Sequence, residues 1–397
     1  MTKFVTAAVL STLLALSAPA FAQQGGPAPG GPAVNSTVFS GEHILAVTAV
    51  TKVFGRSQRI VAAIVEYDAP VANAGLSAEA FTVTDRKITR VYANDMAELA
   101  ETGQDGRFVV IEMDPEDEAA VVYAPQVDTT PTVVVAQTQA VAAVDGRSFA
   151  PTETAIINTR LSALIVDDFR QFTFTDPETG LLLTYNLFIP KDYDPAQAYP
   201  MVLFMHDAGV TGTNPLRTLE QGLGAVAFAS PEDQARHPAF VLAPQYPVAL
   251  ANDASQISVY ADITVRLIAA LQGDYSVDAD RIYTTGQSGG CMTSIALNIK
   301  YPDLFAASLL VAGQWDPAVV APLADHKIFA VVSQDDDKAY PGMTAIMEVL
   351  AKNGMTVAKP SEAFQAELLA IGETMTNEWL ERAGEPGKAI IDAYRAE

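Results

Sequence analysis

Short runs of β-branched and apolar residues, separated by turn-prone clusters, dominate the chain from about residue 40 to residue 158. The longest run is Arg59–Tyr67 (RIVAAIVEY), and the shorter ones are Phe81–Val83, Val91–Tyr92, Phe108–Met113 and Val133–Ala136. Asn73-Ala74-Gly75 and Gln104-Asp105-Gly106 are among the turn signals between them. Several short strands without a helical period predict a small β-sandwich over residues 38–158.

From about residue 165 the pattern changes to apolar runs that alternate with segments of helical period. The predicted strands are Phe172–Thr175, Leu183–Ile189, Met201–Met205, Phe240–Ala243, Ile282–Thr285, Ala306–Val311 and Ile328–Ser333. The predicted helices are Tyr260–Leu271, Cys291–Ile299, Met343–Ala351 and the late segment Glu362–Ala383. Alternating strands and helices indicate an α/β domain over 165–397, with a mainly parallel sheet and helices on both faces.

The first residues have the order of a secretory signal peptide. Lys3 precedes the apolar run Phe4–Leu16, and Ala20-Phe21-Ala22 resembles a small-residue cleavage site. The run is too short to span a membrane comfortably, so an uncleaved anchor is the less favoured alternative. We expect residues 1–22 to be removed, residues 23–37 (Gly/Pro-rich) to act as a linker, and the mature protein to be periplasmic or secreted without a stable membrane span.

Charge and cysteine content narrow the function classes. The 397 residues carry a net charge of -23, which disfavours binding to nucleic acid or anionic lipid. The single cysteine, Cys291, cannot form a disulfide within one chain and is expected to be a buried small hydrophobic residue. There is no P-loop, dinucleotide fingerprint or His/Cys cluster in the sequence, so neither a cofactor nor a metal is expected.

One motif carries a candidate chemistry, the G-x-S-x-G formed by Gly286, Gln287, Ser288, Gly289 and Gly290. It lies between a predicted strand and a predicted helix, which is the context of a nucleophile elbow. The sharp turn would place Ser288 above the sheet, and the N-terminus of the next helix would face developing negative charge. The alternative is a Gly-rich turn that contains an ordinary serine.

A second candidate loop, Phe204–Gly209, directly follows an apolar strand. In α/β-hydrolases such a loop supplies one oxyanion N–H and the residue after the nucleophile supplies the other. Here the donors would be Asp207 or Ala208 together with Gly289. His206 is expected to brace the loop or border the substrate rather than act as base, because triads run serine, acid, histidine in chain order.

A third candidate is the acidic turn Ser333–Asp337 at the end of a late strand, where a triad carboxylate belongs. Asp336 is the first choice and Asp337 the second. The alternatives are a solvated acidic turn or a weak calcium site. Trp315 follows another strand end and is predicted either to line a substrate loop or to pack in the core.

These segments resemble a known family. TTGQSGGCMTSIALNIKYPDLFAASLLVAGQWD, with MVLFMHDAG before it and VVSQDDDKAYPGM after it, is similar to the esterase and predicted-peptidase branch of the α/β-hydrolases, related to poly(3-hydroxybutyrate) depolymerase-like and feruloyl-esterase-like enzymes. VTKVFGRSQRIVAAIVEYDAP and ITRVYAND resemble the immunoglobulin-like domain that precedes some of these esterases. The resemblance implies an α/β-hydrolase fold after an immunoglobulin-like sandwich, with Ser288 as nucleophile and Asp336 orienting a histidine base.

The histidine itself is missing at the expected place. The chain has His43, His206, His237 and His326, none of which follows Asp336. Three hypotheses follow: the sequence is a fragment that ends before the histidine, His326 or His206 serves as base, or catalysis has been lost and binding kept. We therefore expect an exported serine hydrolase of small or polymeric carboxylic esters, with a peptidase or a catalytically degenerate binding protein as alternatives. The sequence does not fix the oligomeric state.

Overall fold

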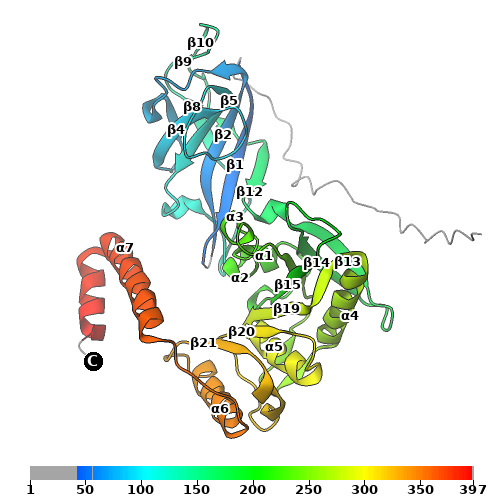
Figure 1. Ribbon diagram of the computed structural model, residues 1–397. Helices are drawn as coiled ribbons and strands as arrows, with labels where there is room; N and C mark the ends of the chain where they lie inside the picture. The colour runs from blue at the N-terminus through cyan, green and yellow to red at the C-terminus, as the bar shows by residue number, and fades with distance from the viewer. Residues whose placement is uncertain (1–42, 56, 396–397) are drawn as a thin grey trace, which may run out of the picture. The chain divides into compact units, whose positions relative to one another are not determined.

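The computed structural model describes residues 43–55 and 57–395, so the predicted signal peptide and linker lie outside the described residues. The chain divides into two compact units (Figure 1). The first ends at Gln171 and also includes Leu219–Val226, and the second contains Phe172–Thr218 and the chain from Ala227 onward. No pattern in the sequence indicated that Leu219–Val226 belongs to the first unit.

The first unit is a β-sandwich. Its larger sheet has the order β12-β1-β2-β5-β4, with β6 and β7 continuing from β2, and a smaller sheet has the order β11-β8-β3. The strands are β1 (Ile44–Val53), β2 (Gln58–Val71), β3 (Phe81–Val83), β4 (Ile88–Asn94), β5 (Gly106–Met113), β6 (Val121–Ala124), β7 (Val127–Asp128), β8 (Val134–Gln137), β9 (Val141–Ala142), β10 (Ser148–Phe149), β11 (Ile156–Ile157) and β12 (Arg160–Ala163). Apolar residues that alternate along β2 and β5, such as Val65 and Ile111, are fully buried in its core, as period-two patterning requires.

The second unit is built on one sheet with the order β13-β14-β16-β15-β19-β20-β21. Its strands are β13 (Arg170–Thr175), β14 (Leu182–Phe188), β15 (Tyr199–Met205), β16 (Phe240–Gln245), β19 (Val277–Gln287), β20 (Ala307–Val311) and β21 (Ile328–Val331), and β17 (Ala251–Asn252) and β18 (Gln256–Ile257) form a separate hairpin. From β16 through β21 every neighbouring pair is parallel, whereas β14 is antiparallel to β16. All these parallel strands therefore end at the same edge of the sheet.

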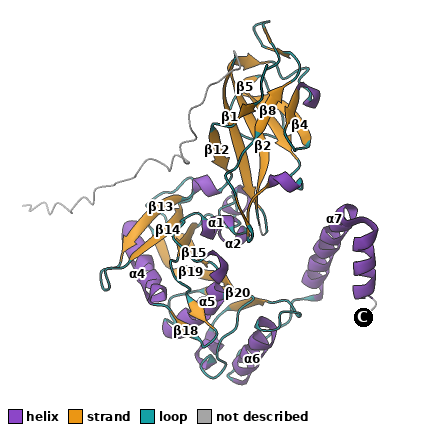
Figure 2. Ribbon diagram, turned by 180° about the vertical axis from the view of Figure 1, so that it is seen from behind, coloured by secondary structure: helices purple, strands orange, loops and turns teal. Residues whose placement is uncertain are grey.

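The α-helices are α1 (Arg217–Glu220), α2 (Leu223–Val226), α3 (Pro231–Gln234), α4 (Val259–Asp274), α5 (Gly289–Lys300), α6 (Ala339–Lys352) and α7 (Glu362–Arg395) (Figure 2). Of these, α2 and the last two residues of α1 belong to the first unit, and the others belong to the second. The Ser258 hydroxyl caps α4 by accepting from the Tyr260 N–H at 3.3 Å. Leu267 of α4 shares a buried cluster with Leu203 of β15, and Ile295 of α5 shares another with Ile346 of α6. Each such side chain contributes roughly 1.5–3 kcal/mol through burial.

The C-terminal helix α7 is broken within its length and carries exposed apolar side chains. Gly384, with φ 60°, interrupts α7, and the predicted helix Glu362–Ala383 is the part of α7 before this interruption. The α7 residues Leu368, Ile371 and Met375 are exposed. Over the described ranges, no helix combines the length and apolar character needed to cross a membrane.

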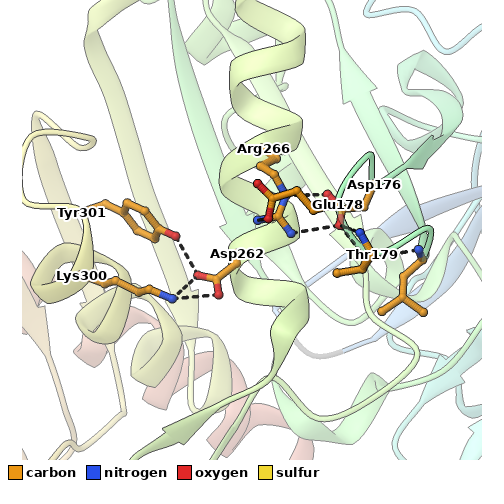
Figure 3. Close-up of polar contacts among 8 residues, drawn as sticks. Asp176, Glu178, Thr179, Asp262, Arg266, Lys300 and Tyr301 are labelled. Carbon is orange, nitrogen blue, oxygen red and sulfur yellow. Dashed lines mark hydrogen bonds and ion pairs between the residues drawn. The ribbon is translucent and has the colours of Figure 1, made fainter.

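An ion-pair network ties α4 to the hairpin between β13 and β14 (Figure 3). The fully buried Asp176 carboxylate receives Arg266 Nε at 2.5 Å and Nη2 at 3.0 Å, and also the N–H and hydroxyl of Thr179. On the same helix, Asp262 binds Lys300 Nζ at 2.7 Å and the Tyr301 hydroxyl at 2.8 Å. Helix α4 is thereby joined both to the hairpin before β14 and to the C-terminal end of α5.

Asp176→Asn is expected to destabilise the second unit at neutral pH. Hydrogen bonding from Arg266 lowers the pKa of Asp176 to about 2, against about 3.9 for an unfolded aspartate. The native pKa is the lower one, so this stabilisation is complete above about pH 4 and is lost as the pH falls towards 2. Thermal unfolding from pH 7 to pH 2 should show the wild type and the variant converging in acid.

Glu178→Gln is the matched control for that experiment. Glu178 pairs with the same arginine at 3.0 Å, but its side chain is 67% exposed. Exposed pairs contribute about 0–1 kcal/mol, so this variant should stay close to wild type. A wild-type advantage over Asp176→Asn that does not shrink in acid would contradict the role given to the Asp176 carboxylate.

Candidate active site

The serine of the G-x-S-x-G motif lies at the turn between β19 and α5. Ser288 has φ 51° and ψ -116°, a conformation that is strained for a residue with a side chain. Its N–H donates to the Val311 carbonyl at 3.1 Å, which fixes the turn to the end of β20. The Ser288 side chain is exposed at the sheet edge where the parallel strands end.

The glycines of the motif are required by how closely α5 approaches β15. A Cβ on Gly290 would lie 1.9 Å from the Met205 carbonyl oxygen, and a Cβ on Gly286 would lie 2.6 Å from the same oxygen. Because these neighbours are backbone atoms, no side-chain movement can make room. Gly289 differs, since a Cβ there would be in ordinary contact, 3.8 Å from the Ala208 nitrogen. Gln287 is exposed at the end of β19.

Two backbone donors meet beside the serine. The Gly289 N–H is in the first turn of α5, where helix geometry provides no acceptor, and Ala208 begins the 3-10 turn Ala208–Val210. Among the residues that the structure describes, no acceptor is bound to the N–H of Ala208 or of Gly289. The Asp207 carboxylate instead accepts from the Gly209 N–H at 2.6 Å. Of the predicted oxyanion candidates, Ala208 and Gly289 are therefore the pair that lies together.

His206 is buried behind this loop, where each ring nitrogen contacts a backbone group and Nε2 also lies 3.5 Å from the Gln245 side-chain nitrogen. Nδ1 is 2.6 Å from the Asp207 carbonyl oxygen, and Nε2 accepts from the Tyr246 N–H at 3.0 Å. Burial lowers the pKa of His206, so the ring is neutral at pH 7. A ring with both nitrogens engaged in this way is not placed to take a proton from Ser288.

Gln245 at the end of β16 is a site-organising residue that the sequence analysis missed. Its amide nitrogen donates to the carbonyls of Val210 at 2.8 Å and Gly212 at 3.2 Å, and its oxygen accepts from the Thr218 N–H. It thus fixes the loop that follows β15. The only available signal was a polar residue at the end of the apolar run Phe240–Ala243, which by itself indicates nothing about its partners.

The predicted acid follows β21, at the same edge of the sheet as Ser288. Because β21 lies two strands from β19, the two strand ends are roughly 10 Å apart. Asp336 Oδ1 accepts from the N–H groups of Ala339 at 2.7 Å and Lys338 at 3.1 Å, and thereby caps α6. Asp337 is exposed, and the Ser333 hydroxyl lowers the pKa of Asp335. In the described part of the chain, no group of three metal-binding side chains occurs, at this turn or elsewhere.

All four histidines of the sequence lie in the described ranges, and none is placed to serve Ser288. His43 belongs to the first unit, and His237 pairs with Asp233 at 3.0 Å before the start of β16. His326 precedes β21, and Ile328 is aligned through β20 with Thr284. At about 3.3 Å per residue, His326 is therefore on the order of 20 Å from Ser288, at the opposite edge of the sheet.

Trp315 packs in the core. It is 7% exposed and shares a cluster with Cys291, Leu310 and Met343, so its position corresponds to the packing alternative. Cys291 is fully buried, and burial raises the pKa of its thiol to about 12.

A polar contact between loops at this edge was not anticipated. Asp253, in the hairpin of β17 and β18, accepts from Gln314 at 3.1 Å and from Lys338 at 3.0 Å. It links the turn after β20 to the acidic turn after β21. Asp253 is exposed and lies far from both residues in sequence, so no local pattern pointed to it.

A parallel sheet with a strained serine between strand and helix, joined to an immunoglobulin-like sandwich, defines an α/β-hydrolase with an N-terminal accessory domain. The sequence profile of the esterase Ig-like N-terminal domain matches residues 46–150. The crystal structure of a thermostable esterase is 31% identical to this chain, with a TM-score of 0.74, and the match covers 78% of this chain and 88% of that one. The chain therefore belongs to the family of this thermostable esterase, and it is an esterase-like hydrolase.

Two further structures match a smaller part of the chain. The feruloyl esterase module from Clostridium thermocellum is 17% identical, with 46% of this chain and 72% of that one covered and a TM-score of 0.37. A ferulic acid esterase from Anaeromyces mucronatus is 12% identical, with 47% and 80% covered and a TM-score of 0.38. Among curated proteins, none matches the chain.

Proposed function

We propose that the protein hydrolyses small or polymeric carboxylic esters through an acyl-enzyme on Ser288. The observation that carries this proposal is the strained serine at the N-terminus of α5, beside the unpaired N–H groups of Ala208 and Gly289 within the described structure. Such donors are aimed at a carbonyl oxygen as it becomes negative, which is usually the largest single contribution to acyl transfer. Membership of an esterase family favours an ester substrate.

In the proposed reaction, Ser288 Oγ forms a bond to the ester carbonyl carbon, and the carbonyl electron pair moves onto oxygen. The N–H groups of Ala208 and Gly289 hold this oxyanion until it collapses and the bond to the alcohol oxygen breaks. The alcohol leaves with a proton from water, and a second water hydrolyses the acyl-enzyme to release the acid. The serine proton passes to hydroxide or water, because none of the histidines of this chain is placed to accept it.

Because no histidine of this chain is placed to activate Ser288, we expect slow formation of the acyl-enzyme. A serine hydroxyl is a weak nucleophile without an adjacent base, and oxyanion stabilisation with binding alone gives about 10³–10⁴-fold acceleration over water. Activated aryl esters should therefore be cleaved slowly. The same observation favours a second candidate, a binding protein that retains the ester site without turnover.

Treatment with a fluorophosphonate separates these two candidates. We expect a single slowly formed adduct by intact-mass analysis, mapped to Ser288 and absent from Ser288→Ala. Ser255→Ala is the matched control, because Ser255 also has a positive φ, 54°, but lies in a hairpin turn without a helix N-terminus. No adduct after prolonged exposure would contradict the enzyme proposal and support the binding protein.

We also propose that the protein is exported to the periplasm or beyond. The order of Lys3, the apolar run and Ala20-Phe21-Ala22 supports this proposal. Expression in a bacterial host, followed by N-terminal sequencing, should give a mature chain that begins at Gln23. Recovery of the protein only in the cytoplasm, with residues 1–22 retained, would contradict export.

A further inference from the structure

We propose that His206 is the positioning residue of the oxyanion hole: its neutral ring, protonated on Nδ1, holds the peptide between Asp207 and Ala208 so that the Ala208 N–H points at the reacting oxygen. This inference rests on the function proposed for Ser288 and assigns a role to a side chain that does not touch the substrate.

The tautomer follows from the backbone contacts of the ring, and the Gln245 side-chain nitrogen, 3.5 Å from Nε2, agrees with it. Nε2 lies 3.0 Å from the Tyr246 nitrogen, which can only donate, so Nε2 must be the unprotonated acceptor. Nδ1 then carries the hydrogen, and it faces the Asp207 carbonyl oxygen at 2.6 Å, which can only accept. Burial lowers the pKa of His206 and keeps the ring in this neutral form.

The direction of the Ala208 N–H follows from the planarity of the peptide bond. The described chain has no cis peptide, so the Asp207 carbonyl and the Ala208 N–H point in opposite directions. With its carbonyl turned towards the buried ring, the peptide turns its N–H away from it. The Ala208 nitrogen is the nearest atom to the position of a Cβ on Gly289, which places it beside the second donor.

The ring is itself held firmly, as a positioning residue must be. The end of β16 supplies the Tyr246 N–H, and the Tyr246 ring lies 5.1 Å from the imidazole. Gln245 fixes the other end of the loop through Val210. On the side of α5, the close approach of Gly290 to Met205 holds the helix against the end of β15, where this loop begins. The hole is thereby built from three strand ends whose spacing the sheet sets.

Two variants divide the contacts of His206 between them. His206→Asn keeps a donor near Nδ1 for the Asp207 carbonyl, whereas His206→Gln keeps a polar group near Nε2 for Tyr246. Each loses one hydrogen bond, so a purely structural role predicts that both lose stability and reactivity together. The positioning role predicts that phosphonylation of Ser288 and kcat for an aryl ester stay within about tenfold of wild type in His206→Asn. In His206→Gln they should fall by about 10²–10³, with KM little changed, as for loss of one oxyanion donor.

Imidazole ¹⁵N NMR tests the tautomer without relying on Ser288. At pH 7 the His206 ring, assigned by comparison with His206→Ala, should carry its proton on Nδ1. His237 is exposed, so the control variant His237→Asn should leave the His206 resonances, the rate of Ser288 phosphonylation and kcat unchanged. A wild type that is never phosphonylated would sink the proposed function while the spectrum still decides the tautomer. A proton on Nε2, a doubly protonated ring, or equal rates for the Asn and Gln variants would overturn the positioning role.

Discussion

Replacing Gly290 with alanine is expected to abolish the stable fold of the second unit. The added Cβ would lie 1.9 Å from the Met205 carbonyl oxygen and 3.0 Å from that of His206. Both atoms belong to the backbone at the end of a central strand, so relief requires α5 to move away from the sheet. The expected loss is about 4–5 kcal/mol or more, which is at the upper end for a single substitution.

Denaturant unfolding, near-UV circular dichroism and soluble yield would measure this loss, and two other glycines serve as controls. Gly289→Ala adds a Cβ on the same helix at an ordinary contact distance, 3.8 Å from Ala208, and should keep the fold. Gly273→Ala meets nothing within 4 Å near the end of α4 and should stabilise by up to about 1 kcal/mol. If Gly290→Ala were as stable as Gly289→Ala, the close approach of α5 to β15 would be wrong.

The sequence was informative wherever a local pattern determines the structure. The apolar run Met201–Met205 became β15, and the helix predicted over Tyr260–Leu271 lies within α4, because burial on one sheet or one helix face leaves a period in the sequence. The G-x-S-x-G motif falls between β19 and α5, as its flanking patterns indicated. The α/β-hydrolase fold and the immunoglobulin-like domain are confirmed.

Element ends were harder to predict, for identifiable physical reasons. The apolar run Arg59–Tyr67 predicted a strand that ends at Tyr67, yet β2 continues to Val71. Pro70 lies inside a register shift between Glu66 and Val71, where no ladder bond requires its missing N–H. Similarly, β19 begins at Val277, well before the predicted Ile282, because polar residues interrupt the segment Asp278–Arg281 and leave no apolar run there.

The organisation of the site depends on contacts between distant residues, which no local pattern encodes. Gln245 reaches Val210 and Gly212 across 35 and 33 residues, and Tyr246 reaches His206 across 40. The sequence could name His206 as a residue that braces a loop, but the protonated nitrogen follows only from its two partners. Likewise, only the direction and register of the parallel strands show that His326 lies at the start of β21, away from the strand ends where Ser288 lies.

Exchanging the nucleophile for a thiol, Ser288→Cys, is expected to raise the rate of acyl-enzyme formation with an activated aryl ester by about tenfold or more at pH 8. In a site with a working base this exchange is harmful, because the machinery is matched to a hydroxyl. Here no histidine is positioned to activate the serine, so the reactivity of the nucleophile at its own pKa decides the rate. A cysteine has a pKa of about 8.5, lowered further at a helix N-terminus, and is partly ionised at pH 8.

Burst kinetics from pH 6 to pH 10 would distinguish the two nucleophiles by the pH dependence of the acylation rate as well as by its magnitude. The thiol variant should rise through its pKa and then level off, while the wild type should rise without a plateau because hydroxide removes the serine proton. The double variant Ser288→Cys/Cys291→Ala is the control for the native thiol. Burial raises the pKa of Cys291 to about 12, so removing it should leave the rate unchanged. A wild type about 100-fold faster than Ser288→Cys, with a plateau near neutral pH, would mean that a general base does act on Ser288.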